Sequence, residues 1–193
     1  MNSEFWSSRY KEGNTGWDIG YISTPIKEYI DQLSHKNLKI LIPGAGNSYE
    51  AEYLFNNGFK NIWICDIAAE PIRNFKERLP EFPENQILHG DFFKIEDQFD
   101  LILEQTFFCA LPIDQRENYA RKVSELLKIN GRICGVLFDF ELDAEGPPFG
   151  GSKEEYLTYF RPYFEIEVFE RCYNSIKPRR GKELFFNFIK RRK

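Results

Sequence analysis

Apolar and polar residues alternate along the chain in a way that predicts short buried strands separated by helices. Residues 38–42 form an apolar run that ends at Pro43, which is typical of a buried parallel strand. Before that run, apolar residues recur at helical spacing between 26 and 33. We expect Thr24 to be the N-cap of this helix and Pro25 to be its first residue. The helix is expected to end at residues 36–37.

The same pattern repeats along the next hundred residues. Sustained alternation of strands and helices indicates a parallel sheet that is covered by helices on both faces. Further strands are predicted at 61–66, 85–89, 99–104 and 132–138, and further helices at 48–57, 70–79 and 114–127.

The last part of the chain departs from this alternation. Residues 164–172 and 183–190 are strand-like, and a turn-rich segment joins them without a helix, which predicts a terminal antiparallel pair. We therefore expect one α/β domain over residues 1–193, with a mostly parallel seven-stranded sheet, a terminal antiparallel hairpin and helices on both faces. This Rossmann-like layout is similar to that of class I methyltransferases.

Composition and charge exclude several classes of protein. No apolar run approaches the roughly 20 residues that a membrane span needs, so no membrane partner is expected. The net charge of −4 argues against nucleic-acid binding, although residues 177–193 are rich in Lys and Arg. We interpret that basic cluster as a solvated hairpin and tail. Residues 1–6 lack the features of a signal peptide, which predicts a cytoplasmic protein.

The cysteines and histidines do not indicate a metal site. The two histidines, His35 and His89, have no second ligand type at a suitable spacing, so no metal is predicted. Free cysteines are commonly buried, and we expect buried reduced thiols here. Cys109 is interpreted as part of a pocket wall and not as a covalent nucleophile. The cysteines are Cys65, Cys109, Cys134 and Cys172.

A glycine-containing loop follows the first strand, where ligands of parallel sheets bind. Gly44, Ala45 and Gly46 allow a tight turn and a close approach of the backbone to a ligand. Tyr49 stands where a dinucleotide fingerprint has its third glycine, and no phosphate-binding Lys-Ser/Thr pair follows. About 20 residues beyond the loop, Asp66 ends the second strand, at the position where a carboxylate accepts hydrogen bonds from ribose hydroxyls.

A second acidic residue ends the third strand. Asp91 is placed to accept a hydrogen bond from an adenine amino group, and Phe92 is placed to pack on the base. A helix cap or turn is the alternative role for Asp91. The loop, Asp66 and Asp91 follow successive strands in the order that a nucleoside-containing ligand requires.

Several longer strings of sequence extend this interpretation over almost the whole chain. Together they resemble the thiopurine S-methyltransferase superfamily, and in particular its thiol and halide methyltransferase branch. One departure is Tyr10, where related sequences often carry tryptophan. The strings are residues 5–18, 42–46, 104–112, Arg116, 119–121 and 146–149.

The resemblance implies that S-adenosylmethionine is the cofactor and that residues 1–23 form an aromatic arm over its site. A sulfonium cation favours aromatic faces, which agrees with that role. The alternative for the arm is simple packing of its tryptophans on the core. The cofactor residues that the resemblance and the strand ends indicate are Trp6, Tyr10, Trp17, Gly44, Ala45, Gly46, Asp66, Ile67, Asp91, Phe92, Glu104, Gln105 and Thr106.

Methyl transfer from a sulfonium needs mainly a nucleophile that is held close and stripped of water, so we expect direct in-line displacement without a catalytic triad. Phe107, Phe108 and Phe149 are expected to form an apolar pocket for a small soft acceptor such as iodide or hydrosulfide. Arg116 or Tyr156 is expected to position that anion. Their alternative roles are a surface helix residue for Arg116 and core packing for Tyr156.

Three functions remain open from the sequence: a thiol or halide methyltransferase, a methyltransferase for a larger or different acceptor, and a nucleotide-binding module without catalysis. In each case the expected partner is a small molecule, and we expect a monomer. The segment 141–151 is rich in Gly and Pro and is expected to help form a lid.

Overall fold

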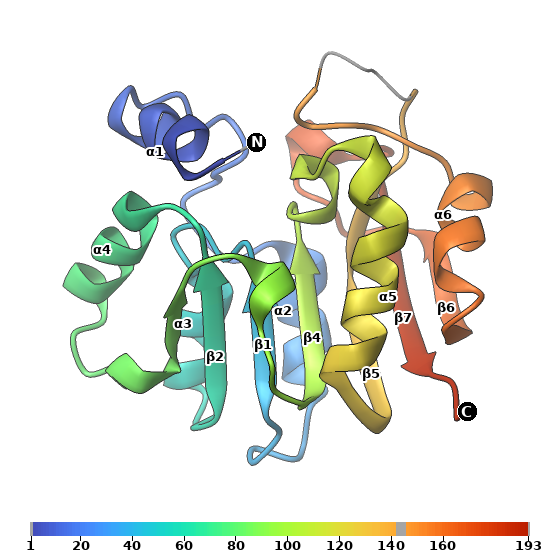
Figure 1. Cartoon of the computed structure of the whole chain (residues 1–193), viewed down its shortest axis with the longest axis horizontal. Coiled ribbons are helices and arrows are strands. Elements are labelled where there is room, and N and C mark those ends of the chain that lie inside the picture. Colours follow the sequence, from blue (N-terminus) through green and yellow to red (C-terminus); the bar gives the residue numbers. More distant parts are fainter. Residues whose placement is uncertain (1, 142–145, 193) are drawn as a thin grey trace.

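The computed structural model describes residues 2–141 and 146–192, and these form a seven-stranded sheet with strand order β3-β2-β1-β4-β5-β7-β6 (Figure 1). The predicted residues 142–145 of the lid segment lie outside the described residues. The strands are β1 (Ile40–Pro43), β2 (Ile62–Asp66), β3 (Ile87–His89), β4 (Phe99–Gln105), β5 (Leu127–Phe138), β6 (Phe164–Arg171) and β7 (Glu183–Lys190).

All neighbouring strands from β3 to β5 pair in parallel, whereas β7 runs antiparallel to both β5 and β6. The predicted fold class, a mostly parallel seven-stranded sheet with an antiparallel end, is thereby confirmed. The strand order changes direction between β1 and β4, since β2 and β3 lie on one side of β1 and the later strands on the other. Such a switch point opens a crevice at the carboxyl ends of the strands.

Helices cover both faces of the sheet (Figure 1). Helices α5 and α6 contribute side chains to one apolar core, and α2, α3 and α4 contribute to the other. The α-helices are α1 (Ser3–Lys11), α2 (Thr24–Asp31), α3 (Tyr49–Asn56), α4 (Ala69–Arg78), α5 (Arg116–Leu126) and α6 (Lys153–Phe160). Short 3-10 turns lie at η1 (Glu84–Gln86), η2 (Phe92–Lys94), η3 (Phe108–Ala110), η4 (Ile113–Gln115) and η5 (Lys177–Arg179).

Two apolar cores, one on each face, explain why the strands read as continuous apolar runs. Leu41 of β1 and Ile102 of β4 pack into the core under α5 and α6. Their neighbours Ile40 and Leu101 point the other way, into the core under α2, α3 and α4. Successive side chains of a strand alternate between faces, so burial of both faces requires an apolar residue at every position.

The helix boundaries differ from the predictions at α2. The N-cap is Ser23 and not Thr24, Thr24 is the first helical residue, and Pro25 follows it. The helix ends at Asp31, short of the predicted end at residues 36–37. The polar residues after Asp31 carry no buried face, and a helix without a buried stripe has little to stabilise it.

Two helices were not predicted. Helix α1 lies within the aromatic arm, where the Asn2 side chain accepts a hydrogen bond from the Phe5 backbone N–H at 3.1 Å. The N-cap of helix α6 is Ser152, whose hydroxyl accepts from the Glu155 N–H at 3.2 Å. The Ser-x-x-Glu spacing of Ser152 and Glu155 is a capping-box pattern that was available in the sequence.

The chain passes from α5 into β5 without a loop. The predicted stop at residues 130–131 exists as a left-handed turn, because Asn130 has a φ of 62°, but it lies inside the strand. The register between β4 and β5 shifts at this point, between Phe99 and Leu101. Within the described residues, no helix is long and apolar enough to span a membrane.

Candidate functional site

A cavity of about 740 Å³ opens at the carboxyl ends of the strands, at the switch point between β1 and β4. Most of the residues that the sequence indicated for a cofactor site come together in its wall. They are Trp6, Tyr10, Trp17, Gly44, Ala45, Gly46, Asp66, Ile67, Asp91, Phe92, Gln105 and Thr106, and the predicted acceptor residue Phe107 joins them.

The loop after β1 forms the floor of this cavity and depends on its two glycines. Gly44 has a φ of 57°, and a Cβ atom there would lie 2.2 Å from the Phe107 ring. Gly46 has a φ of 53°, and a Cβ atom there would lie 2.9 Å from the Tyr10 hydroxyl. Any larger residue would close the space between the loop and the opposite wall, so the glycines keep the backbone within reach of a ligand.

Asp66 stands at the end of β2 with its carboxylate fixed by the backbone. One oxygen, Oδ2, accepts from the Gly46 N–H at 2.8 Å, and Oδ1 accepts from the Ala68 N–H at 2.9 Å. Burial raises the pKa of Asp66, and the backbone N–H groups oppose that rise. Each carboxylate oxygen can accept a second hydrogen bond, so the pair suits two neighbouring hydroxyl groups.

Asp91 follows β3 and does have a turn role, because its Oδ1 accepts from the Phe93 N–H at 2.9 Å and caps η2. Its side chain also lines the cavity. Phe92 is buried and meets the Phe107 ring edge to face, with 5.4 Å between ring centroids. The cap and a ligand contact are therefore compatible at Asp91.

The aromatic arm lies at the edge of the sheet that carries the cavity, with α1 near α4 (Figure 1). Trp17 meets Trp6 and Tyr10 edge to face, with centroid distances of 5.5 Å and 5.8 Å. The Ser3 hydroxyl donates to the Ile67 carbonyl at 2.9 Å, which ties α1 to the segment after β2. The arm thus supplies one wall of the cavity.

Glu104 does not line the cavity but lies directly behind its wall. It is fully buried, and its Oε1 accepts from the backbone N–H groups of Phe107 at 2.8 Å and Phe108 at 2.9 Å. Its other oxygen accepts from the Tyr119 hydroxyl. Burial raises the pKa of Glu104 to about 7. Glu104 therefore shapes the turn that carries Thr106, which has a φ of 61°.

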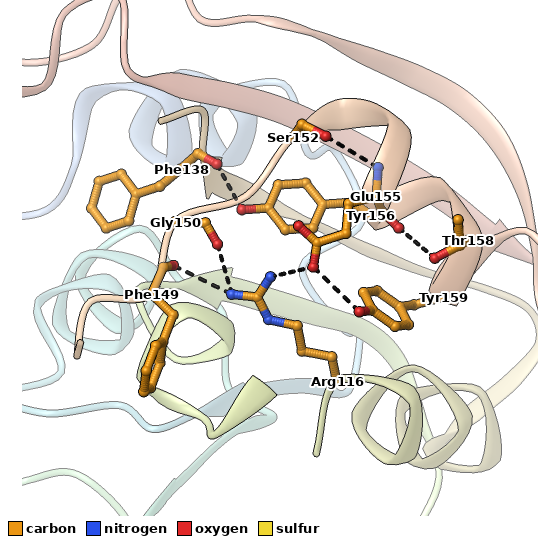
Figure 2. A network of polar contacts seen from close by, with 9 residues as sticks. All are labelled: Arg116, Phe138, Phe149, Gly150, Ser152, Glu155, Tyr156, Thr158 and Tyr159. Carbon is orange, nitrogen blue, oxygen red and sulfur yellow. Dashed lines mark hydrogen bonds and ion pairs between the residues drawn. The ribbon is translucent and has the colours of Figure 1, made fainter. Parts of the chain in front are cut away.

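The predicted acceptor residues Arg116, Tyr156, Phe108 and Phe149 also stand behind the wall and are not among the described residues that line the cavity. Arg116 is fully buried at the start of α5, so it is neither a surface residue nor exposed to a ligand. The Tyr156 hydroxyl donates to the Phe138 carbonyl at 2.7 Å, inside the core (Figure 2). Tight packing of the segment 149–151 against α5 and α6 places these side chains inward.

Sequence reasoning missed several residues of the wall, and Arg179 is the clearest case. It was assigned to the solvated basic cluster, yet it is buried, lines the cavity and donates to the Trp17 carbonyl at 2.6 Å. Its second partner is Glu183 at 3.4 Å. Nothing in a run of Lys and Arg distinguishes the one that turns inward. Other missed wall residues are Asp18, Ser23, Glu50 and Phe138, whereas Pro147 and Pro148, which also line the cavity, belong to the segment 141–151 that is expected to help form a lid.

Comparison with known proteins places this geometry in a family. The family model of thiopurine S-methyltransferase matches residues 1–190. The chain belongs to the thiopurine S-methyltransferase family. The resemblance inferred from the sequence strings is thereby confirmed, and this family member is an S-adenosylmethionine-dependent methyltransferase.

Relatives of this methyltransferase carry names from several branches. A probable thiol methyltransferase 2 of Arabidopsis thaliana is 28% identical over 184 residues, covering 92% of this chain and 81% of the relative. A thiopurine S-methyltransferase of Acinetobacter baylyi is 25% identical, covering 87% and 88%. A thiocyanate methyltransferase 1 of Brassica oleracea is 25% identical, covering 92% and 81%.

Solved structures support the fold of this methyltransferase. A TehB-like SAM-dependent methyltransferase of Corynebacterium glutamicum has a TM-score of 0.69 at 23% identity and covers 98% of both chains. A 1,6-didemethyltoxoflavin-N1-methyltransferase of Burkholderia thailandensis, solved with S-adenosylhomocysteine, has a TM-score of 0.81 at 17% identity and covers 98% of this chain and 87% of its own.

The wall of the cavity suits the family cofactor. The glycine loop gives the close backbone approach that only small residues allow, and the fixed Asp66 carboxylate offers two free acceptor positions for a diol. The acidic side chains Asp18, Glu50 and Asp91 also line the cavity and favour a cation.

Proposed function

We propose that this methyltransferase transfers the methyl group of S-adenosylmethionine to a small, soft, anionic nucleophile, a thiolate, hydrosulfide or halide, by direct in-line displacement. We also propose that residues 1–193 act as one domain in which residues 1–23 cover the cofactor. The observation that carries this proposal is Arg179, a buried cation that lines the cavity beside apolar side chains, while Asp66 and Asp91 line it after β2 and β3.

Most acidic residues of the wall come from the first half of the chain, and Asp114 is the exception. Asp66 and Asp91 end β2 and β3, Glu50 lies in α3, and Asp18 belongs to the arm. Arg179 precedes β7, and its guanidinium lies 5.8 Å from the ring centroid of Phe138, which ends β5. Arg179 is not remote from all of the acidic residues, since it donates to the Trp17 carbonyl, next to Asp18. Burial raises the pKa of Glu50, and the charge of Arg179 opposes that rise. A cationic cofactor fits the part of the wall with Asp66 and Asp91, and an anionic acceptor fits the part where Arg179 lies beside Phe138.

Much of the wall that comes from the second half of the chain is apolar, although Asp114 and Gln115 also line it. It includes Phe107, Cys109, Phe138 and the prolines Pro147 and Pro148. Such a wall removes water from a polarizable anion at little expense, because soft anions are weakly hydrated compared with carboxylates or phosphates. The guanidinium of Arg179 then offsets the remaining charge and orients the anion.

The cofactor, when bound, supplies a methyl group that is already activated by its sulfonium charge. The electron pair of the nucleophile forms the new bond to carbon while the old carbon–sulfur bond breaks and its pair stays on sulfur. No proton has to move if the acceptor arrives as an anion. The tasks of the chain are therefore to hold two ligands in line and to exclude water. The Cys109 thiol is not needed as a nucleophile, and burial raises its pKa, which keeps it protonated.

The experiment offers iodide, hydrosulfide, thiocyanate and an aryl thiol in parallel and measures S-adenosylhomocysteine and the methylated product. Turnover of at least one small anion supports the proposal. Binding of S-adenosylhomocysteine by calorimetry without turnover of any acceptor would overturn it in favour of a non-catalytic module.

A larger aromatic thiol is the second candidate acceptor. The rings of Phe107 and Phe138 and the faces of Pro147 and Pro148 offer flat apolar surfaces within a cavity of about 740 Å³. Cavities of this size hold ligands much larger than a halide. Preference for the aryl thiol over iodide and hydrosulfide, measured as kcat/KM, would favour this candidate over the first.

A further inference from the structure

Arg116, at the start of α5, contacts three other parts of the chain from a fully buried position (Figure 2). Its guanidinium donates to the Glu155 carboxylate of α6 at 2.7 Å and to the Gly150 carbonyl at 2.7 Å. A longer contact of 3.4 Å reaches the Phe149 carbonyl. The guanidinium also lies over the ring of Phe108 in η3, 5.0 Å from its centroid.

The segment that Arg116 holds is continuous with the cavity wall. Pro147 and Pro148 line the cavity, and they directly precede the two carbonyl groups that accept from Arg116. The Phe149 N–H donates to the Cys109 carbonyl at 2.8 Å, and the Gly151 N–H donates to the Phe140 carbonyl at 2.9 Å. These bonds fix the segment on both sides of the contact with Arg116.

We propose that Arg116 is a positioning residue that holds the segment 146–151 as the outer wall of the acceptor end, and so determines which acceptors fit. This role rests on the proposed function, since it concerns the acceptor of that reaction. Arg116 does not touch the acceptor. It acts through Pro147 and Pro148, whose depth in the cavity depends on where the carbonyl groups of Phe149 and Gly150 are held.

A purely stabilising role does not explain a buried arginine at this position. Replacing a buried ion pair by apolar residues of similar volume is often neutral or stabilising, because desolvation of the charges offsets their attraction. The Nε atom of Arg116 has no partner among the described residues, which adds to that desolvation. What apolar residues cannot provide is a rigid fork that binds a carboxylate and two carbonyl groups at once.

Glu155 completes the arrangement by orienting the guanidinium. Its Oε1 accepts from Arg116 and also from the Tyr159 hydroxyl at 3.2 Å (Figure 2). Its backbone N–H is capped by Ser152, one residue beyond the held segment. The segment therefore continues directly into helix α6, which carries the counter-ion of Arg116. As long as the ion pair is intact, Arg116 holds both the segment and the start of α6 against α5.

The test compares Arg116→Lys with Arg121→Lys, a matched change on the same helix. Lysine keeps the charge but lacks the planar guanidinium that donates to several groups at once. Arg121 is half exposed and pairs with Glu125 at 2.8 Å, so its replacement serves as the control. Three quantities are measured: hydrogen exchange at the Phe149 and Gly151 amides, S-adenosylhomocysteine affinity, and KM for the best acceptor. Glu155→Gln serves as a second variant if Arg116→Lys does not fold.

We expect Arg116→Lys to speed exchange at both amides at least about tenfold and to raise the acceptor KM at least about tenfold, since small displacements of positioning groups have large effects. The S-adenosylhomocysteine affinity stays within about twofold, and Arg121→Lys changes none of the three. Unchanged exchange, or a loss of cofactor affinity equal to the rise in acceptor KM, would overturn the proposal. If the unaltered protein methylates no acceptor, the proposed function fails, while the exchange rates still decide whether Arg116 holds the segment.

Discussion

The guanidinium of Arg179 donates a hydrogen bond of 2.6 Å to the backbone carbonyl of Trp17, 162 residues earlier in the chain. This bond connects the aromatic arm to the residues before β7 across the mouth of the cavity. One side chain therefore links the wall of the cofactor end to the wall of the acceptor end, and the two ends respond to changes at Arg179 together.

Two substitutions of Arg179 distinguish the effect of its charge from the effect of its hydrogen bond to the Trp17 carbonyl. Arg179→Gln removes both, and we expect KM for an anionic acceptor to rise roughly ten- to hundredfold, as for loss of one charge-assisted hydrogen bond. Arg179→Lys keeps the charge and should give a smaller rise. Steady-state kinetics with iodide and an aryl thiolate measure both. Arg180→Gln is the matched control, because Arg180 is exposed. Equal effects at the two arginines would remove Arg179 from the acceptor site.

Asp66 is expected to carry a large share of cofactor affinity. Asp66→Asn leaves one acceptor oxygen in place of two, so the contacts to Gly46 and Ala68 compete with those to the ligand. We expect S-adenosylhomocysteine binding to weaken by about 1.5–3 kcal/mol, which is roughly ten- to more than a hundredfold. Calorimetry measures the change. Asp97→Asn is the control, since Asp97 is half-buried and pairs with Lys39, and a similar loss there would show that the effect is not local.

Glu104 should make stability depend on pH. Its folded pKa of about 7 lies above the ordinary value of about 4.3. Between these two values the folded protein binds more protons than the unfolded chain, so the free energy of unfolding falls as pH rises through that window. At about 1.4 kcal/mol per pH unit, the fall reaches roughly 4 kcal/mol.

Glu104→Gln stays uncharged and still offers an oxygen to the backbone N–H groups of Phe107 and Phe108. We expect its stability, relative to the unaltered protein, to improve between pH 5 and pH 7. Urea unfolding at both pH values measures this difference, and Glu165→Gln at an exposed position is the control. A difference that does not change with pH would place the pKa of Glu104 near its ordinary value.

Alanine substitutions at two glycines with positive φ distinguish the effect of backbone strain from the loss of cofactor binding. Gly44 has a φ of 57° and Gly58 a φ of 86°, so alanine at either position should destabilise the fold by about 1–2 kcal/mol. Only at Gly44 does the new Cβ atom also meet a side chain, the ring of Phe107 at 2.2 Å. We expect Gly44→Ala to abolish calorimetric binding of S-adenosylhomocysteine and Gly58→Ala to retain it. Normal binding by Gly44→Ala would show that the loop does not cradle the cofactor.

The sequence predicted the strands better than the helices for a physical reason. Strands such as β1 and β4 are buried on both faces, so their apolar runs are continuous and easily found. Helix α1 has no buried residue, and its aromatic side chains form no stripe that a periodic pattern would reveal. Helix α6 was detectable only from its cap, Ser152 with Glu155.

The same reasoning applies to the site. Gly44, Gly46, Asp66 and Asp91 were predictable because each follows a strand, and the topology of a parallel sheet brings strand ends together. The positions of arginines were not predictable in this way. Whether an arginine side chain points toward a ligand or into the core depends on how loops distant in sequence pack around it. The residues next to the arginine in sequence do not reveal that packing.

The arm should become more ordered when the cofactor binds. Helix α1 has no buried residue, and its ion pair of 3.2 Å to Glu70 uses Lys11, which is 68% exposed. Segments with so few buried contacts open easily. Trp6 and Trp17 both line the cavity, so a bound ligand adds a surface against which they pack.

We therefore expect S-adenosylhomocysteine to slow tryptic cleavage at Arg9 and Lys11 at least about fivefold, because each kilocalorie of added stability reduces the open population about that much. Trp6→Ala should abolish this protection. Phe5→Ala is the matched control, since Phe5 is an aromatic residue of the same helix but is not among the described residues that line the cavity. Equal cleavage of the arm with and without the ligand would mean that the arm is a fixed part of the fold, and that its aromatic residues do not respond to the cofactor.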